Sequence, residues 1–189
     1  MVTHFQMTFF LDSSGESLHK RGYKVAIFKA PLSECLAAGM ILLSGWDQKQ
    51  PLYDPMCGSG TLLTEAALIA RNIAPGLYRD DFGFTHWPDF DKELFLNLQK
   101  EARKAEIHSD VQIFGSDVSM QALDETRQNL ESAELEDAVL VDVGDVEGHR
   151  LGGGGVGIGG VEVLLHEHIR LFSGRFDDAD TVLISQFLQ

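Results

Sequence analysis

The hydrophobic pattern of this chain changes several times between two spacings, and these changes predict alternating strands and helices. One short apolar run ends at Asp54, and two others cover Val111–Phe114 and Ala138–Val143. Runs of this length are typical of strands buried within a parallel sheet. Between them, apolar residues recur three or four positions apart, as they do along one face of a helix. The pattern therefore predicts an α/β domain built on a parallel sheet.

Four segments have the helical spacing and recognisable ends. Helices are predicted to open at Pro31, to cover Leu62–Asn72 and Asp91–Glu106, and to follow Ser119. Proline fits the first helical position because the N–H that it lacks has no partner there. Glycine fits the position after a helix, so Gly45 is expected to end the first of these helices. Ser119 is the expected N-cap of the last, since its hydroxyl can accept a backbone N–H.

The two ends of the chain differ from this central pattern. Phe5–Leu11 and Lys24–Phe28 have the composition of strands and flank a polar connection, which predicts an N-terminal β-hairpin. Residues 151–160 are mostly glycine, and glycine loses most entropy on ordering, so we expect a flexible link there. Asp180–Phe187 is predicted as a fourth strand. The expected parts are a hairpin extension (1–30), an α/β domain (31–145), and a Gly-rich link with a diverged or truncated C-terminal segment (146–189).

Composition agrees with one soluble domain. The chain has 189 residues, of which 44% are hydrophobic and 23% are charged, so it can bury a core. Its two cysteines, Cys35 and Cys57, make no disulfide framework, which favours a reducing compartment. No apolar run approaches the ~20 residues of a membrane span, and the N-terminus lacks the basic region of a signal peptide. We therefore expect a cytoplasmic protein without a membrane partner.

A loop of small residues joins the first predicted strand to the helix after it. Its sequence is Asp54-Pro55-Met56-Cys57-Gly58-Ser59-Gly60-Thr61. A strand–loop–helix unit brings backbone N–H groups and a positive helix end to a ligand, and Gly58 and Gly60 let the ligand lie against the backbone. The spacing fits neither the dinucleotide fingerprint nor the P-loop. The acid at the strand end favours a ligand with a positive or hydroxyl-bearing group beside its carboxylate, such as S-adenosylmethionine (SAM). The alternative is an ordinary turn.

A second acid stands where an adenosine ligand needs one. Asp117 lies at the end of the second strand after the glycine loop. A carboxylate at that place can accept hydrogen bonds from both ribose hydroxyls. Its alternative role is helix capping, for which Ser119 is better placed. Asp117 is therefore predicted to contact the ribose.

The string from Asp54 to Thr61 resembles motif I of the amino-directed, SAM-dependent methyltransferases. It is most similar to the THUMP-associated methyltransferases that modify guanine in large-subunit ribosomal RNA. Four other stretches are similar to this family, and they are residues 12–23, 30–34, 70–77 and 82–87. The resemblance runs from about residue 7 to about residue 145. It implies SAM as cofactor and a Rossmann-like methyltransferase fold with strand order 3-2-1-4. Both a complete parallel sheet and one that lacks some strands are compatible with the resemblance.

The resemblance also implies roles for single residues. In similar enzymes the segment before motif I folds over the methionine end of the cofactor, which is the place expected for Pro31 if it is more than a helix start. An acid after the third strand bonds the adenine amino group, and Gly144 favours Asp145 over Asp142 for this role. The expected cofactor-binding residues are Pro31, Asp54, Pro55, Cys57, Gly58, Ser59, Gly60, Thr61, Asp117 and Asp145.

Substrate and partner follow from the same resemblance. The family transfers the methyl group to the exocyclic amine of guanine in 23S ribosomal RNA, and a THUMP domain helps to grip that RNA. No THUMP-like segment is visible in this chain. Its 15 basic and 29 acidic residues give a net charge of −14. Since phosphate contacts need Lys and Arg, we expect the chain alone to bind RNA weakly.

The catalytic loop of the family has no counterpart in this sequence. Similar enzymes carry Asn/Asp-Pro-Pro-Tyr/Phe after the fourth strand, where it holds the amine and stacks on the flipped base. Here Gln186-Phe187-Leu188-Gln189 follows that strand, and no catalytic residue is assigned. Two alternatives stay open, a non-catalytic SAM-binding fragment and an adenine or cytosine amino-methyltransferase acting on DNA. His166-Glu167-His168 lacks zinc-site spacing, so no metal is expected.

Overall fold

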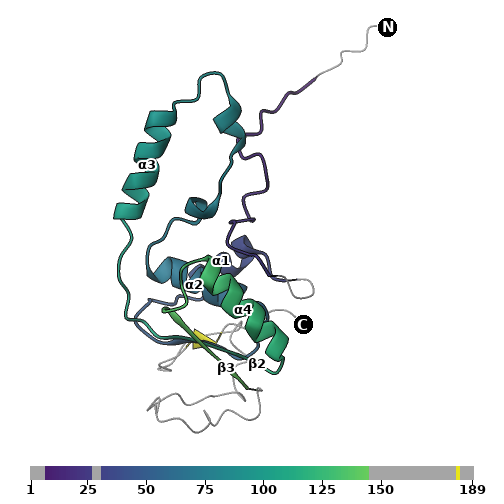
Figure 1. Cartoon of the computed structure of the whole chain (residues 1–189), viewed down its shortest axis with the longest axis vertical. Coiled ribbons are helices and arrows are strands. Elements are labelled where there is room, and N and C mark those ends of the chain that lie inside the picture. The colour runs from purple at the N-terminus through teal and green to yellow at the C-terminus, as the bar shows by residue number, and fades with distance from the viewer. Residues whose placement is uncertain (1–6, 27–30, 145–181, 184–189) are drawn as a thin grey trace.

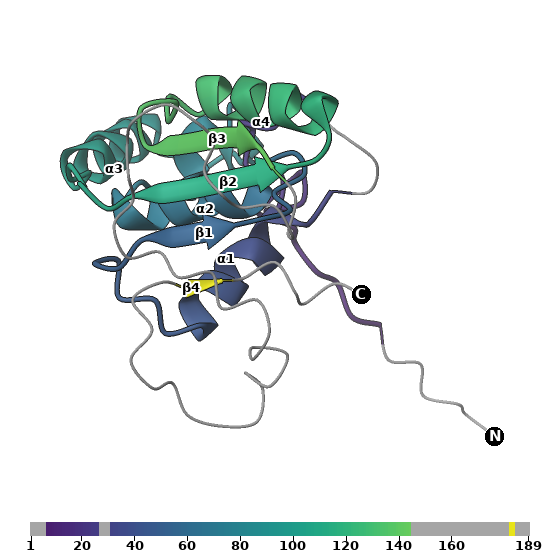
Figure 2. The ribbon, with the colours of Figure 1, turned by 90° about the horizontal axis from the view of Figure 1, so that it is seen from below.

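A parallel sheet forms the centre of the molecule. The computed structural model describes residues 7–26, 31–144 and 182–183. Four strands lie side by side in the order β3-β2-β1-β4, and all pair in parallel (Figure 2). Their bounds are β1 Leu52–Asp54, β2 Ile113–Asp117, β3 Val139–Val143 and β4 Val182–Leu183. The predicted fold class and strand order 3-2-1-4 are therefore confirmed.

Three helices form a layer on one face of this sheet. α2 (Thr61–Ala70) and α4 (Met120–Ser132) pack on β2 and β3, and α1 (Glu34–Leu43) packs beside α2. Figure 1 shows the three helices together, on the same side of the strands. Gly115 in β2 allows α2 to approach, because a Cβ there would lie 2.3 Å from Cδ1 of Leu63. The core between the layers contains Leu52, Leu63, Ala66, Ile113, Leu123, Leu130 and Val139.

The predicted helix ends lie within two residues of those in the structure, except at the start of the first helix. Ser119 caps α4, and its hydroxyl accepts the N–H of Ala122 at 3.3 Å. Gly45 follows the last turn of α1 with a φ of +78°, as expected for a C-terminal glycine. The prediction that Pro31 opens α1 is wrong. Ser33 has an extended backbone and is the N-cap, so the helix begins at Glu34.

The expected N-terminal hairpin is absent from the residues that the structure describes. Residues 7–26 contain no strand, and positions 5–6 and 27–28 of the prediction lie outside the described part. Side chains hold this segment in place of a strand ladder. Arg79 donates hydrogen bonds to the carbonyls of Ser14, Glu16 and Ser17. Phe9 and Phe10 are exposed, so these two rings do not pack into the core formed by the described residues.

One predicted helix stands apart from the sheet. α3 (Lys92–Lys104) begins at the N-cap Asp91 and projects away from the other helices in Figure 1. Its sequence is amphipathic, yet none of its residues is buried. Phe95 packs against the rings of Phe82, Phe84 and Phe90, with centroids 5.5–5.9 Å apart. These four rings form a separate small cluster.

No helix in the described ranges has the length and apolarity that a membrane span requires.

Candidate cofactor site

The glycine loop between β1 and α2 is a tight turn with left-handed backbone. Gly58 and Gly60 have φ values of +55° and +75°, a region that glycine enters without steric cost. The turn is closed by the Gly60 N–H, which donates to the Cys57 carbonyl at 2.8 Å. Gly60 is the N-cap of α2 and offers no side-chain cap to the first helical N–H groups. The positive end of α2 is therefore available to an anionic group of a ligand.

The two glycines of the loop have different surroundings. A Cβ built on Gly58 would meet nothing within 4 Å, whereas a Cβ on Gly60 would lie 2.5 Å from Cγ2 of Thr126. Thr126 therefore fills the space beside Gly60 that a Cβ would take, and the contact of the Gly60 backbone with the cofactor stays a prediction. That glycine is needed for the approach of α4. Gly58 is the position at which the loop backbone faces open space.

Two buried side chains of α4 donate hydrogen bonds to carbonyl groups of the glycine loop. Thr126 donates its hydroxyl hydrogen to the Gly58 carbonyl at 2.7 Å, and Asn129 donates to the Ser59 carbonyl at 3.0 Å. Both residues have no exposed surface. Neither residue was predicted from the sequence to contact the loop. The available signal was a pair of polar residues, three positions apart, on the apolar face of a helix.

Asp54 and Asp117 lie at the carboxyl ends of neighbouring strands. Asp54 ends β1 and Asp117 ends β2, in a register that pairs Asp54 with Gly115. Asp117 accepts the N–H of Gly58 at 3.0 Å and the N–H of Ser119 at 2.9 Å. Asp54 is 4% exposed and accepts the Met56 N–H at 3.1 Å. Burial, with a smaller contribution from the charge of Asp117, raises the pKa of Asp54 to about 6.

The other loop residues are mostly buried and serve the packing of the turn. Cys57 is buried, and this burial raises the pKa of its thiol to about 12, so the thiol is neutral at pH 7. The Pro55 carbonyl accepts the hydroxyl of Ser116 at 3.2 Å. Ser59 and Thr61 are buried, and Thr61 is the first residue of α2. The fold thus brings together the loop from Asp54 to Thr61 and Asp117.

Two expected cofactor contacts are not part of this cluster. Pro31 is half-buried and lies three residues before α1, and its contact with the cofactor stays a prediction. Asp145 lies outside the residues that the structure describes. Asp142, its competitor, is exposed on β3 and accepts the N–H of Val143 at 2.7 Å. The acid for the adenine amine therefore stays a prediction.

The residues present fit SAM. Gly58 leaves open space beside the backbone, and the uncapped N-terminus of α2 suits a carboxylate. The buried carboxylate of Asp54 suits an ammonium group, and Asp117 offers acceptors for hydroxyls. Within the same described ranges, no three His, Cys, Asp or Glu side chains form a group that could hold a metal ion.

Comparison with known proteins supports this assignment. Residues 21–158 match the family of RMKL-like methyltransferase domains. The ribosomal RNA large subunit methyltransferase K/L of Vibrio cholerae is 44% identical over 143 residues, which cover 71% of this chain and 20% of that protein. The crystal structure of SMU.472 complexed with S-adenosylhomocysteine (SAH) is 41% identical with a TM-score of 0.65. It covers 71% of this chain and 35% of that one.

The name of a third relative refers to DNA and not to RNA as the substrate. It is a Listeria monocytogenes protein described as a predicted N6-adenine-specific DNA methylase, 38% identical with a TM-score of 0.68, covering 71% of this chain and 36% of that one. The chain thus spans about a fifth of the Vibrio protein and about a third of the two solved structures. The match over residues 21–158 shows that the chain belongs to the family of RMKL-like methyltransferase domains, and the expected resemblance to SAM-dependent methyltransferases is confirmed.

Proposed function

We propose that this chain binds SAM at the glycine loop and serves methyl transfer to the exocyclic amine of guanine in large-subunit ribosomal RNA. The observation that carries the proposal is the 44% identity to the Vibrio ribosomal RNA methyltransferase over 71% of this chain. The family match over residues 21–158 includes the whole loop. The motif from Asp54 to Thr61 supports the amino-directed chemistry. Guanine N2 is the finer part of the proposal and comes from the family resemblance.

Each polar group at the site has a task in this proposal. SAM supplies the methyl group on a sulfonium. The carboxylate of its methionine part binds at the uncapped end of α2, and its ammonium group lies by Asp54. Asp117 accepts the ribose hydroxyls while it holds Gly58. Asp145 is proposed for the adenine amine and Pro31 for the methionine end. No residue is proposed to take the proton of the guanine amine.

The RNA partner is proposed to be held mainly outside this chain. The chain carries a net charge of −14, which opposes binding to a polyanion. It also covers only 20% of the Vibrio protein. A THUMP domain is the proposed holder of the RNA, on the family resemblance alone. In this arrangement the described residues supply the cofactor site.

Two other functions have some support. The likeness to the Listeria protein, described as an adenine-specific DNA methylase, favours a DNA substrate. The absence of an Asn/Asp-Pro-Pro-Tyr/Phe tetrapeptide from the sequence favours a SAM-binding fragment without chemistry of its own. The similarity of residues 82–87 to the RNA family supports the ribosomal RNA substrate over DNA.

Binding and transfer assays separate the three functions. Titration calorimetry with SAM and SAH tests the cofactor site, and saturable binding is expected. Transfer of tritium from labelled SAM is then compared on large-subunit ribosomal RNA and on unmethylated duplex DNA. Weak transfer to RNA and none to DNA is expected. Preferential transfer to DNA would overturn the substrate, and tight SAM binding without any transfer would support the fragment.

A further inference from the structure

The carbonyl groups of the glycine loop are fixed by one face of α4. Thr126 and Asn129 are three residues apart and donate to consecutive carbonyls, those of Gly58 and Ser59. In a trans peptide the C=O and the following N–H point in opposite directions, and no cis bond occurs in the described residues. The N–H groups of Ser59 and Gly60 therefore point away from α4.

Only one of these two N–H groups has a partner in the described residues. The Gly60 N–H donates to the Cys57 carbonyl, whereas the Ser59 N–H has no acceptor among them. A loop with its carbonyls turned to the protein and an N–H turned outward is suited to an anionic group. Without the donors of α4, the peptide planes of the loop could rotate and present a carbonyl to that group.

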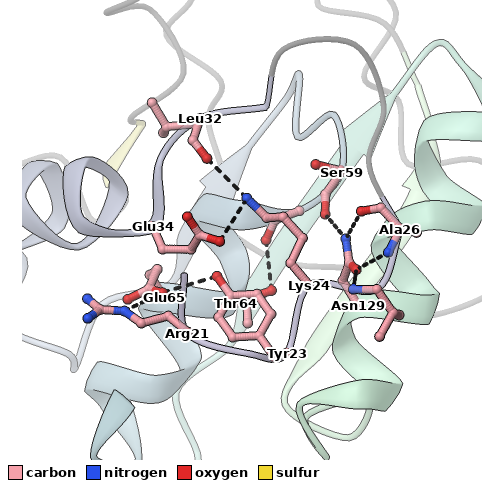
Figure 3. Close-up of polar contacts among 12 residues, drawn as sticks. Arg21, Tyr23, Lys24, Ala26, Leu32, Glu34, Ser59, Thr64, Glu65 and Asn129 are labelled. Atoms are coloured by element: carbon pink, nitrogen blue, oxygen red, sulfur yellow. Dashed lines mark hydrogen bonds and ion pairs between the residues drawn. The ribbon is translucent and has the colours of Figure 1, made fainter. Parts of the chain in front are cut away.

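Asn129 has a second set of contacts, which reach the N-terminal segment. Its side-chain oxygen accepts the N–H groups of Val25 and Ala26, both at 2.9 Å, and its nitrogen donates to the Ala26 carbonyl at 3.0 Å. Figure 3 shows this amide between Ser59 and Ala26. One side chain thus joins the cofactor loop to the backbone that leads toward Pro31.

Two further side chains of residues 23–26 bind the segment to other parts of the fold. Tyr23 donates its hydroxyl hydrogen to Glu65 in α2 at 3.1 Å. Lys24 forms an ion pair with Glu34 at 3.3 Å and donates to the Leu32 carbonyl at 3.1 Å (Figure 3). The chain is therefore tied down at Ala26 by Asn129 and at Leu32 by Lys24, on either side of Pro31.

We propose that Asn129 is a positioning residue of the SAM site, which orients the loop peptides with Thr126 and couples them to residues 23–26. It acts through the backbone of Ser59 and does not itself need to touch the cofactor. The inference rests on the proposed SAM site at the glycine loop. It predicts that cofactor binding and the order of residues 23–26 depend on each other.

The test compares two conservative changes, each of which removes a hydrogen-bond donor at a contact of α4. Asn129→Asp keeps an acceptor for Val25 and Ala26 but removes the donor to Ser59 and Ala26. Tyr78→Phe removes a hydrogen bond of 2.9 Å from Tyr78 to the carbonyl of Ala133, just beyond the last turn of α4. By titration calorimetry, the Kd for SAH is expected to rise by about tenfold or more in Asn129→Asp and by less than about twofold in Tyr78→Phe.

Amide hydrogen exchange gives a readout that a purely structural role would not move. SAH is expected to slow exchange at Val25 and Ala26 in the unchanged chain, and this effect is expected to be lost in Asn129→Asp. If Asn129→Asp does not fold, Thr126→Val, which removes the donor to Gly58, is expected to weaken SAH binding by about threefold or more.

Three results would overturn the inference. The first is a folded Asn129→Asp chain that binds SAH as the unchanged chain does, or an unfolded one together with unchanged SAH binding in Thr126→Val. The second is Tyr78→Phe weakening SAH binding as much at an equal loss of Tm. The third is failure of the unchanged chain to bind SAH, which would overturn the proposed cofactor site and the inference with it.

Discussion

The carboxylate of Asp117, at the end of β2, accepts the backbone N–H of Gly58 at 3.0 Å. The acid proposed for the ribose therefore also holds the loop proposed for the methionine part. Its other oxygen accepts the N–H of Ser119, which caps α4. One side chain thus joins the end of β2, the glycine loop and the start of α4, so a change at this position should affect binding in two ways.

Asp117→Ala is expected to weaken SAM binding by about 1–3 kcal/mol, because the ribose loses a charged acceptor and Gly58 loses its hydrogen bond. Asp117→Asn retains one oxygen acceptor and is expected to lose less. Titration calorimetry of the two variants measures the difference. Equal SAM affinity in Asp117→Ala and the unchanged chain would show that Asp117 has no contact with the cofactor.

The stability of the chain without cofactor is expected to fall as Asp54 ionises. Its pKa in the fold is about 6, against an ordinary value of 3.8, so the neutral form is favoured in the folded state. The resulting stabilisation is fully present below about pH 4 and is lost as the pH rises through about 6, a change of about 3 kcal/mol at most. Chemical unfolding of the unchanged chain and of Asp54→Asn, compared between about pH 4.5 and 7.5, checks this. The same pH dependence of unfolding in both chains would contradict it.

SAM binding is expected to have the opposite dependence on pH. An ammonium group beside Asp54 favours the ionised carboxylate and lowers its pKa. Binding should therefore release a proton near pH 6, and the affinity for SAH should decrease as the pH falls through about 6. Calorimetry in two buffers of different ionisation enthalpy measures the proton release. No proton release, or the same release in Asp54→Asn, would show that the ammonium group binds elsewhere.

Gly58→Ala and Gly60→Ala form a matched pair, since both positions have a left-handed backbone with φ values of +55° and +75°. Each change costs about 1–2 kcal/mol of folding stability for the conformation alone. Gly58→Ala places its methyl group in open space and is expected to weaken SAH binding with little further loss of stability. Gly60→Ala places it 2.5 Å from Cγ2 of Thr126 and is expected to lower the free energy of unfolding more.

Thermal unfolding and SAH titration of both variants separate the two effects. Undiminished SAH affinity in Gly58→Ala would show that the cofactor does not lie against the glycine loop. Equal Tm values for the two variants would show that α4 yields to the added methyl group at Gly60.

Local features made much of the fold predictable. The three core strands, their helices and the caps at Ser119 and Gly45 were placed to within a few residues, because periodicity and capping depend on neighbours in the sequence. The start of α1 and the N-terminal hairpin were not predicted correctly. Pro31 has the local chemistry of a helix start, and residues 7–11 and 24–26 have that of strands. In the structure, Arg79 binds the carbonyl of Ser14, 65 positions away. Lys24 binds Leu32 and Glu34, before and at the start of α1. These contacts give both segments conformations that differ from the predicted ones.

The sequence by itself determined the loop from Asp54 to Thr61, the family and the cofactor, because the chemistry of these residues is contiguous in the chain. Only the tertiary structure decided how that loop is held. Asn129 contacts Ser59 and Ala26, which are 70 and 103 positions away, and Thr126 determines which glycine faces the open side. Such contacts leave no periodic signal, because a buried polar side chain on a helix finds its partners only after the helix has packed.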